Sequence, residues 1–276
     1  MLKTPQAMIP SDKTFVFVIG THRSGTSLLH TILRDHDDVS GFKNTGVSED
    51  EGQHLQTVMP NDQELGGVGV ASFSPRAHMT EEVADLDRAG ALLFQQWAPH
   101  WDLSKDILVE KSPPSIARTR FLQAVFPNAH FIVLRRHPIA SCLALMKWVG
   151  SREPIYRLIE NWVRLYETLE ADLPYLKRVH TLYYEDLVSD PKTQLDQISA
   201  FLNLKTPLEP SGVKSGLSSR YFDTWVSGEY YMWRGQNPAY RYLKRNYNHL
   251  KRMQTVLKLE RRLNRLGYSF KSQLPL

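Results

Sequence analysis

The chain has one cysteine among 276 residues, so no disulfide can form within it. A single thiol cannot build a thiolate metal cluster either. The ten histidines are scattered along the chain, so no metal site is expected. Cys142 lies in an apolar run, which favours a buried structural residue over a reactive thiol. Few cysteines are typical of reducing compartments, and we expect a cytoplasmic protein.

Long hydrophobic runs are also missing. No stretch reaches the length of a membrane-spanning helix, and residues 1–11 lack the apolar core of a secretory signal. We therefore expect no stable membrane insertion. The sequence shows no internal repeat, low-complexity tract or linker that would divide it. We expect a single domain over residues 1–276, with an aromatic and basic helical region at about 220–270 as part of it.

Acidic residues are scarce late in the chain. The net charge is +5, and between Arg234 and Lys271 the only acid is Glu260. A solvated helix face would explain this, as would a positive rim that attracts an anionic cofactor or substrate. No motif that reads nucleic acid is present, so nucleic acid is not an expected partner.

Apolar strands alternate with amphipathic helices along the chain. Strands are expected over residues 15–19, 107–109, 131–134 and 179–183, and helices over 26–34, 80–97, 115–126, 138–148, 154–172, 191–202 and 243–266. Residues 40–69 are polar and predict a long loop with one helical turn. The alternation predicts an α/β fold with a central parallel sheet flanked by helices.

Residues 15–30 predict a buried strand, a tight loop and the start of a helix. Such a loop binds anions, because the first N–H groups of the helix and its dipole point at the ligand. Gly20 and Gly25 have the spacing of an ATP-binding loop, but Thr26 stands where that loop has lysine. Arg23 is the cation here. In a kinase, the loop lysine contacts the phosphate that is transferred. Without it, the loop predicts a phosphate-bearing ligand other than ATP.

Polar sequence also follows two other predicted strands, at 110–112 and 135–137. Ligands of parallel sheets bind at the carboxyl ends of the strands. We therefore expect the three polar segments to converge on one site.

Four motifs in this order resemble the sulfotransferases that use 3′-phosphoadenosine 5′-phosphosulfate (PAPS). Residues 21–27 are similar to the 5′-phosphosulfate loop, 110–113 to the central-strand signature, 126–138 to the 3′-phosphate segment and 184–187 to a tyrosine-acid-acid turn. The resemblance runs from Phe15 to Leu204. It implies a P-loop-like sulfotransferase architecture and a transferase that moves the sulfuryl group of PAPS to a hydroxyl or amine without a metal.

The resemblance implies where the 5′-phosphosulfate binds. Its ligands would be five consecutive residues: Arg23, Ser24, Gly25, Thr26 and Ser27. The backbone N–H groups of Ser24, Gly25 and Thr26 would wrap the anion, and the hydroxyls of Thr26 and Ser27 would add donors. His22 stands where the family often has proline.

For the 3′-phosphate, the resemblance implies Arg136, whose planar fork makes paired contacts, with Arg135 as the adjacent alternative. The family usually has a serine eight residues later, where this chain has Ala144. Ser141 lies one helical turn earlier, on roughly the same face of the helix. Either Ser141 supplies the missing hydroxyl, or the 3′-phosphate has no serine contact here. Tyr184 resembles the family tyrosine near the adenine, although a core aromatic would fit equally well.

The resemblance also implies that Lys111 approaches the leaving oxygen or the sulfuryl group. The base that takes the acceptor's proton stays open. Glu51 and His54 are three residues apart, so on a helix they would share a face. Some family branches use a histidine at the position of Pro113, which excludes that arrangement here. The candidates for the base are Glu49, Glu51, His54 and Glu110.

Two other functions remain open at the level of sequence: a P-loop-type nucleotide kinase and a non-catalytic anion-binding module. The acceptor is also open, because the aromatic residues between Tyr221 and Tyr247 suit either an acceptor pocket or a core and lid. Small-molecule, glycan and lipid-linked alcohols are all compatible, and no oligomeric state follows.

Overall fold

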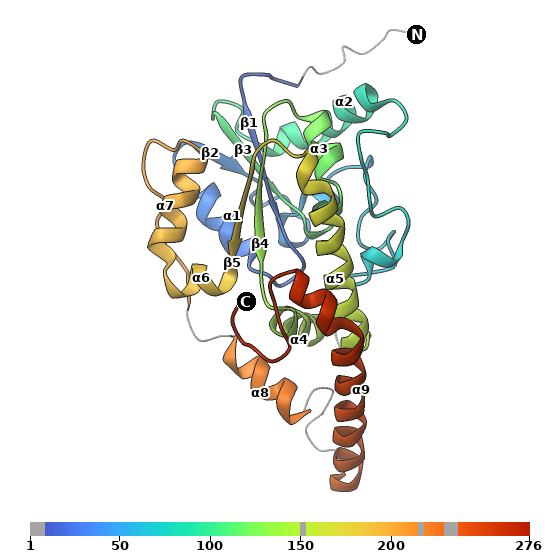
Figure 1. Ribbon diagram of the computed structural model, residues 1–276. Helices are drawn as coiled ribbons and strands as arrows, with labels where there is room; N and C mark the ends of the chain where they lie inside the picture. The colour runs from blue at the N-terminus through green and yellow to red at the C-terminus, as the bar shows by residue number, and fades with distance from the viewer. Residues whose placement is uncertain (1–8, 150–152, 215–217, 229–236) are drawn as a thin grey trace.

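The computed structural model describes residues 9–149, 153–214, 218–228 and 237–276. A five-stranded sheet lies at its centre (Figure 1). The strands are β1 (Thr14–Ile19), β2 (Val39–Gly41), β3 (Ile107–Lys111), β4 (Ala129–Arg135) and β5 (Val179–Tyr183). Their order is β2-β3-β1-β4-β5, and every neighbouring pair is parallel. The predicted α/β fold with a parallel sheet is confirmed.

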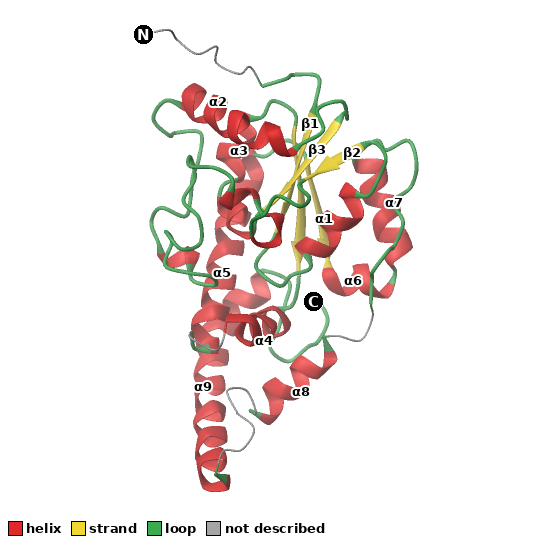
Figure 2. Ribbon diagram, turned by 180° about the vertical axis from the view of Figure 1, so that it is seen from behind, coloured by secondary structure: helices red, strands yellow, loops and turns green. Residues whose placement is uncertain are grey.

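Helices cover both faces of the sheet (Figures 1 and 2). The helices of the described residues are α1 (Thr26–Arg34), α2 (Leu86–Trp97), α3 (Thr119–Val125), α4 (Pro138–Val149), α5 (Ile155–Asp172), α6 (Tyr184–Ser189), α7 (Pro191–Phe201), α8 (Ser219–Ser227) and α9 (Pro238–Arg265), of which α8 lies beyond the sheet. Phe15 and Phe17 of β1 pack into the core under α2, α3 and α5, whereas Val16 and Val18 pack into the core under α1 and α7. Both faces of β1 are apolar because both are covered.

Some predicted elements have different bounds. Helix α2 begins at Leu86 rather than at Thr80, because Asp85 caps it by accepting a hydrogen bond from the Arg88 N–H. The predicted helix over 115–126 is a 3₁₀ turn at Pro113–Ala117 followed by α3. The predicted loop over 40–69 contains the end of β2, which has three residues and pairs with β3.

Helix α9 is longer than predicted, because Asn237 caps it at Pro238. Its C-terminal half packs beside α5, and its N-terminal half extends past the sheet next to α8 (Figures 1 and 2). Over the described ranges, no helix has both the length and the apolar character needed to cross a bilayer. Cys142 is buried in α4 as predicted, and burial raises the pKa of its thiol.

Candidate active site

The β1–α1 loop has the backbone geometry of an anion site. Arg23 and Gly25 both have positive φ, 64° and 103°. Ser24 is fully buried, and its hydroxyl donates to the Thr21 carbonyl at 2.7 Å. Helix α1 begins directly after this turn, at Thr26. The first N–H groups of a helix have no partner within the helix. Those groups and the helix dipole favour an anion in front of α1.

One detail of the predicted loop is wrong. The Ser24 N–H donates to the Thr21 carbonyl at 3.2 Å, so it closes the turn instead of facing a ligand. The N–H groups that remain for an anion therefore begin at Gly25. Ser27 is half-buried, and its hydroxyl donates to Glu49 at 3.0 Å.

Tyr184 joins this loop to the second predicted anion segment. A Cβ added at Gly25 would lie 2.7 Å from Tyr184 Cδ2, so the ring packs on the loop backbone. On the ring, Arg136 stacks with its guanidinium carbon 4.2 Å from the ring centre. Tyr184 also belongs to the core under α1 and α7, so the ring is a core aromatic as well as a neighbour of both segments.

Arg136 is buried and lies beside the loop. Its guanidinium donates to the Arg23 carbonyl at 2.9 Å and to the Ser218 hydroxyl at 3.1 Å. Burial lowers the pKa of Arg136. Neither its Nε nor the buried Ser141 Oγ has a hydrogen-bond partner among the described residues. Unpaired buried donors are costly, and a bound anion would give each of these two groups a partner.

The neighbouring arginine has another role. Arg135 pairs with Glu170 of α5 and stacks on Tyr166 of the same helix. It therefore contacts α5 instead of the β1–α1 loop. Of the two predicted alternatives, Arg136 is the one beside the loop. Ala144 is buried in α4 and offers no side-chain donor.

Lys111 lies at the end of β3 and is fully buried. Its ammonium donates to Glu51 Oε1 at 2.8 Å and to the Glu49 carbonyl at 3.2 Å. A buried ammonium requires such partners, because desolvation of an unpaired charge is expensive. The structure therefore brings together Lys111 and Glu51, two of the predicted catalytic residues.

The polar end of β3 holds the segment that carries Glu51. Glu110 accepts a hydrogen bond from the Gly52 N–H at 3.0 Å, and the Ser112 hydroxyl accepts one from the Gln53 N–H at 2.9 Å. Trp97 of α2 donates to the Gly52 carbonyl at 2.9 Å. A Cβ at Gly52 would lie 2.6 Å from Glu110 Oε1, so only glycine permits this close approach.

Glu51 and His54 are neighbours, although no α-helix joins them: the segment consists of short turns within the predicted loop. Glu51 is extended, with φ −83° and ψ 127°, between the 3₁₀ turns Ser48–Asp50 and Gly52–His54. His54 Nε2 lies 4.0 Å from Glu51 Oε2 because the second turn bends back.

The other carboxylates suit a base less well than Glu51 does. Glu110 has a pKa raised to about 7 by burial, which suits a base, but it has no exposed surface for an acceptor to reach. Glu49 is exposed and accepts the Ser27 hydroxyl. The Glu51 side chain keeps 10% of its surface exposed while it contacts Lys111. Glu51 is therefore held by a cation and still partly exposed to an acceptor.

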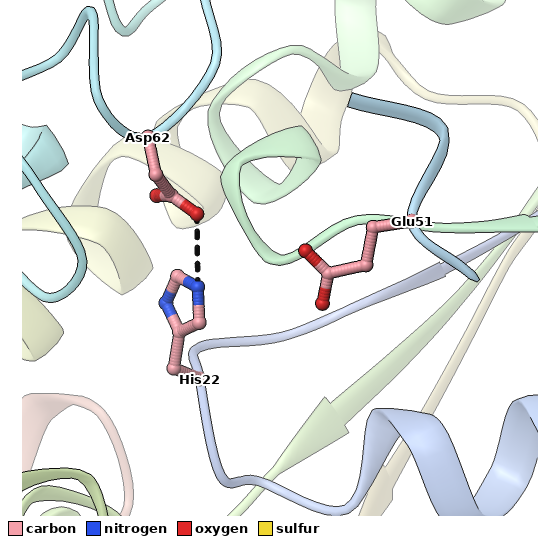
Figure 3. A group of neighbouring side chains, drawn as sticks. All are labelled: His22, Glu51 and Asp62. Carbon is pink, nitrogen blue, oxygen red and sulfur yellow. Dashed lines mark hydrogen bonds and ion pairs between the residues drawn. The ribbon is translucent and has the colours of Figure 1, made fainter. Parts of the chain in front are cut away.

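A buried network that the sequence did not reveal adjoins Glu51 (Figure 3). His22 bonds to Asp62 at 3.1 Å, and the Gln53 amide donates to Asp62 at 2.8 Å and to Glu51 at 2.5 Å. Burial lowers the pKa of His22, but the charge and hydrogen bond of Asp62 outweigh it and leave the pKa raised. His22 is therefore held toward its charged form beside the loop.

His22, Glu51 and Asp62 also have ligand atoms within 4.8 Å of one another, a grouping that the scattered histidines did not predict. Three such atoms can hold a metal ion. However, Gln53 already donates to both carboxylates and Lys111 to Glu51. A cation here would have to displace those donors.

Comparison with known proteins places this geometry in context. Residues 16–208 match a family described as the sulfotransferase family. Protein-tyrosine sulfotransferase 1 of Danio rerio is 26% identical over 200 residues, which cover 70% of this chain and 54% of that protein. Omega-hydroxy-beta-dihydromenaquinone-9 sulfotransferase Stf3 of Mycobacterium tuberculosis is 22% identical over 243 residues, covering 68% of this chain and 62% of that protein.

Among solved structures, the sulfotransferase domain from the Synechococcus PCC 7002 olefin synthase aligns with a TM-score of 0.49 and 19% identity, over 87% of this chain and 97% of that one. The chain spans only about half the length of two of the tyrosine sulfotransferases that it matches, 54% for the Danio rerio protein and 52% for the Gallus gallus protein.

Proposed function

The chain belongs to the sulfotransferase family, and we propose that it transfers the sulfuryl group of PAPS to a hydroxyl or amine of an acceptor. The observation that carries the proposal is a pair of neighbouring anion sites that both contact Tyr184. One is the β1–α1 loop, and the other is Arg136 with Ser141. PAPS has two anionic ends, and a nucleotide with a single phosphate group would leave the second site unused.

The positions of the predicted cofactor-binding residues support a role for each of them. Arg23 and the N–H groups of Gly25, Thr26 and Ser27 would bind the 5′ end. Arg136 would bind the 3′-phosphate through Nε, which is unpaired within the described ranges, and Ser141 would supply the hydroxyl that Ala144 lacks. Bound PAPS would supply a sulfuryl group activated by its phosphate leaving group.

The catalytic roles fall to the pair at the end of β3. Glu51 would accept the proton of the acceptor hydroxyl as its oxygen forms a bond to sulfur. Lys111 would stabilise the negative charge that develops during transfer. His54 lies 4.0 Å from Glu51 and would orient it. No resident metal is part of the proposal, because the cations near the transferred group come from side chains.

The acceptor proposed is a small-molecule, glycan or lipid-linked alcohol. The names of the relatives include a protein-tyrosine sulfotransferase and a menaquinone sulfotransferase, so related chains act on chemically different hydroxyls. Tyr230, Tyr231 and Trp233, which the sequence suggested for an acceptor pocket, lie outside the described residues.

The experiment is acceptor-dependent formation of adenosine 3′,5′-bisphosphate from PAPS, measured by chromatography with phenolic, saccharide and lipid alcohols. Glu51→Gln should lower kcat by about 100-fold or more with cofactor affinity unchanged. Glu64→Gln, at a half-exposed glutamate outside the site, is the matched control. Full activity in Glu51→Gln would remove it as the base, and failure of the wild-type protein to bind the bisphosphate would overturn the proposal.

A further inference from the structure

Helix α9 has an exposed apolar stripe that the proposed chemistry does not use. Leu243, Leu250 and Leu257 recur every seven residues and are 66%, 53% and 83% exposed. Other large side chains on the stripe are also exposed: Tyr240, Tyr242, Tyr247 and Met253. At 3.6 residues per turn these seven positions cover about 160° of the helix.

The leucines of the stripe lie on the side of α9 opposite its buried residues, while Lys251 and Lys258 at the stripe's edge line a shallow hollow with Tyr156 and Glu160 of α5. The buried residues of α9 and of the turn after it are Asn248, Thr255, Leu259, Leu263 and Leu266. They lie about half a turn from the leucines. Asn248 donates to the Gly228 carbonyl at 2.8 Å and Arg252 to the Trp225 carbonyl at 3.0 Å, so α8 covers the opposite face.

The charge of α9 is strongly positive. Residues 238–265 contain nine lysines and arginines and one acid. Lys244, Lys251 and Lys258 follow the same seven-residue spacing along one edge of the stripe. Long lysine stems can lie along apolar surface while their ammonium groups reach a polar layer.

We infer that α9 attaches the protein to an anionic lipid surface. A basic helix with tyrosines and leucines on its free face lies in the plane of a bilayer interface, with the apolar stripe among the acyl chains and the lysines at the headgroups. The stripe from Tyr240 to Leu257 is about 26 Å long, and in this arrangement it would lie parallel to the bilayer surface.

A second copy of the chain is the competing occupant, because leucines at seven-residue spacing suit a helical partner. Two features oppose it. Pairing two copies of α9 would bring like charges together. The stripe is also wider than the narrow seam of a two-helix coiled coil, whereas a bilayer covers a wide face.

The test is co-sedimentation of the full chain with vesicles of phosphatidylcholine alone or of phosphatidylcholine with phosphatidylserine. The protein should sediment with the anionic vesicles only, and added salt should weaken the binding. Leu250→Asp should lower the vesicle-bound fraction, whereas Leu103→Asp, at an exposed leucine outside α9, should not. Combined Lys244→Gln, Lys251→Gln and Lys258→Gln should lower the partition coefficient by about 100-fold.

Equal binding by wild type and Leu250→Asp would overturn the inference. The inference would also be overturned if the wild-type protein did not bind anionic vesicles but formed a dimer in analytical ultracentrifugation, and Leu250→Asp dissociated that dimer. Circular dichroism of each variant separates loss of binding from loss of fold; Leu250, Leu103 and Lys258 are exposed, and Lys244 and Lys251 are partly exposed.

Discussion

The ion pair between Lys111 and Glu51 is the residue-scale feature on which the proposed chemistry depends. Lys111 is fully buried, and Glu51 is its carboxylate partner at 2.8 Å. Removing one member of a buried pair leaves the other charge without compensation, whereas replacing both is far less costly. Comparing a single with a double variant can therefore distinguish the pair's role in stability from its role in catalysis.

Lys111→Met should lower the free energy of unfolding by about 3 kcal/mol, because Glu51 loses the ammonium that compensates it. The double variant Lys111→Met, Glu51→Gln should recover much of that loss in urea unfolding. Both variants should lack sulfuryl transfer. A double variant that is both stable and active would show that the pair is structural only.

Glu110 makes stability depend on pH. Burial raises its pKa from 4.5 to about 7, so the folded protein holds a proton that the unfolded chain releases. The resulting stabilisation is fully present below pH 4.5 and is lost as the pH rises through about 7. It amounts to about 3 kcal/mol. Urea unfolding across this range should show the decline, and Glu110→Gln should flatten it; an unchanged slope in the variant would assign the decline to other groups.

At the scale of elements, the β1–α1 loop depends on close packing as well as on charge. Gly25 combines a positive φ with a Cβ position 2.7 Å from Tyr184. Gly46 also has a positive φ, 82°, but a Cβ there would meet no atom within 4 Å. The two glycines therefore separate backbone strain from steric clash.

Gly25→Ala should abolish binding of adenosine 3′,5′-bisphosphate in calorimetry, because the added methyl group displaces either the loop or Tyr184. Gly46→Ala carries similar backbone strain and should bind normally. Equal affinities in the two variants would mean that the contact with Tyr184 does not shape the site.

The sequence predicted the long, periodic elements well. Helix α1 and strand β5 have the predicted bounds. It missed β2, whose three residues are a strand only because β3 lies beside them. It predicted a loop with one helical turn around Glu51, but not the hydrogen bonds from Gly52 and Gln53 to the end of β3 that hold that segment in tight turns.

At the scale of the whole molecule, the site joins residues far apart in the chain. His22 meets Asp62 across 40 positions and Lys111 meets Glu51 across 60. Local patterns identified the anion-binding loop and the polar strand ends, and the family resemblance singled out Arg136 and Lys111 within them. Neither identifies partners that only the folded chain brings together, which is why Asp62 and the contact of Arg136 with the loop carbonyl were not predicted.

The central claim is that the two anion sites bind the two ends of one nucleotide. Its most direct test is thermal unfolding with adenosine 3′,5′-bisphosphate, with AMP and magnesium ATP in parallel. The bisphosphate should raise the melting temperature, since a ligand at 100 times its Kd stabilises the folded state by about 2.7 kcal/mol. Arg136→Ala should remove the advantage of the bisphosphate over AMP. A shift with ATP alone, or equal shifts with AMP and the bisphosphate in the wild-type protein, would contradict the claim.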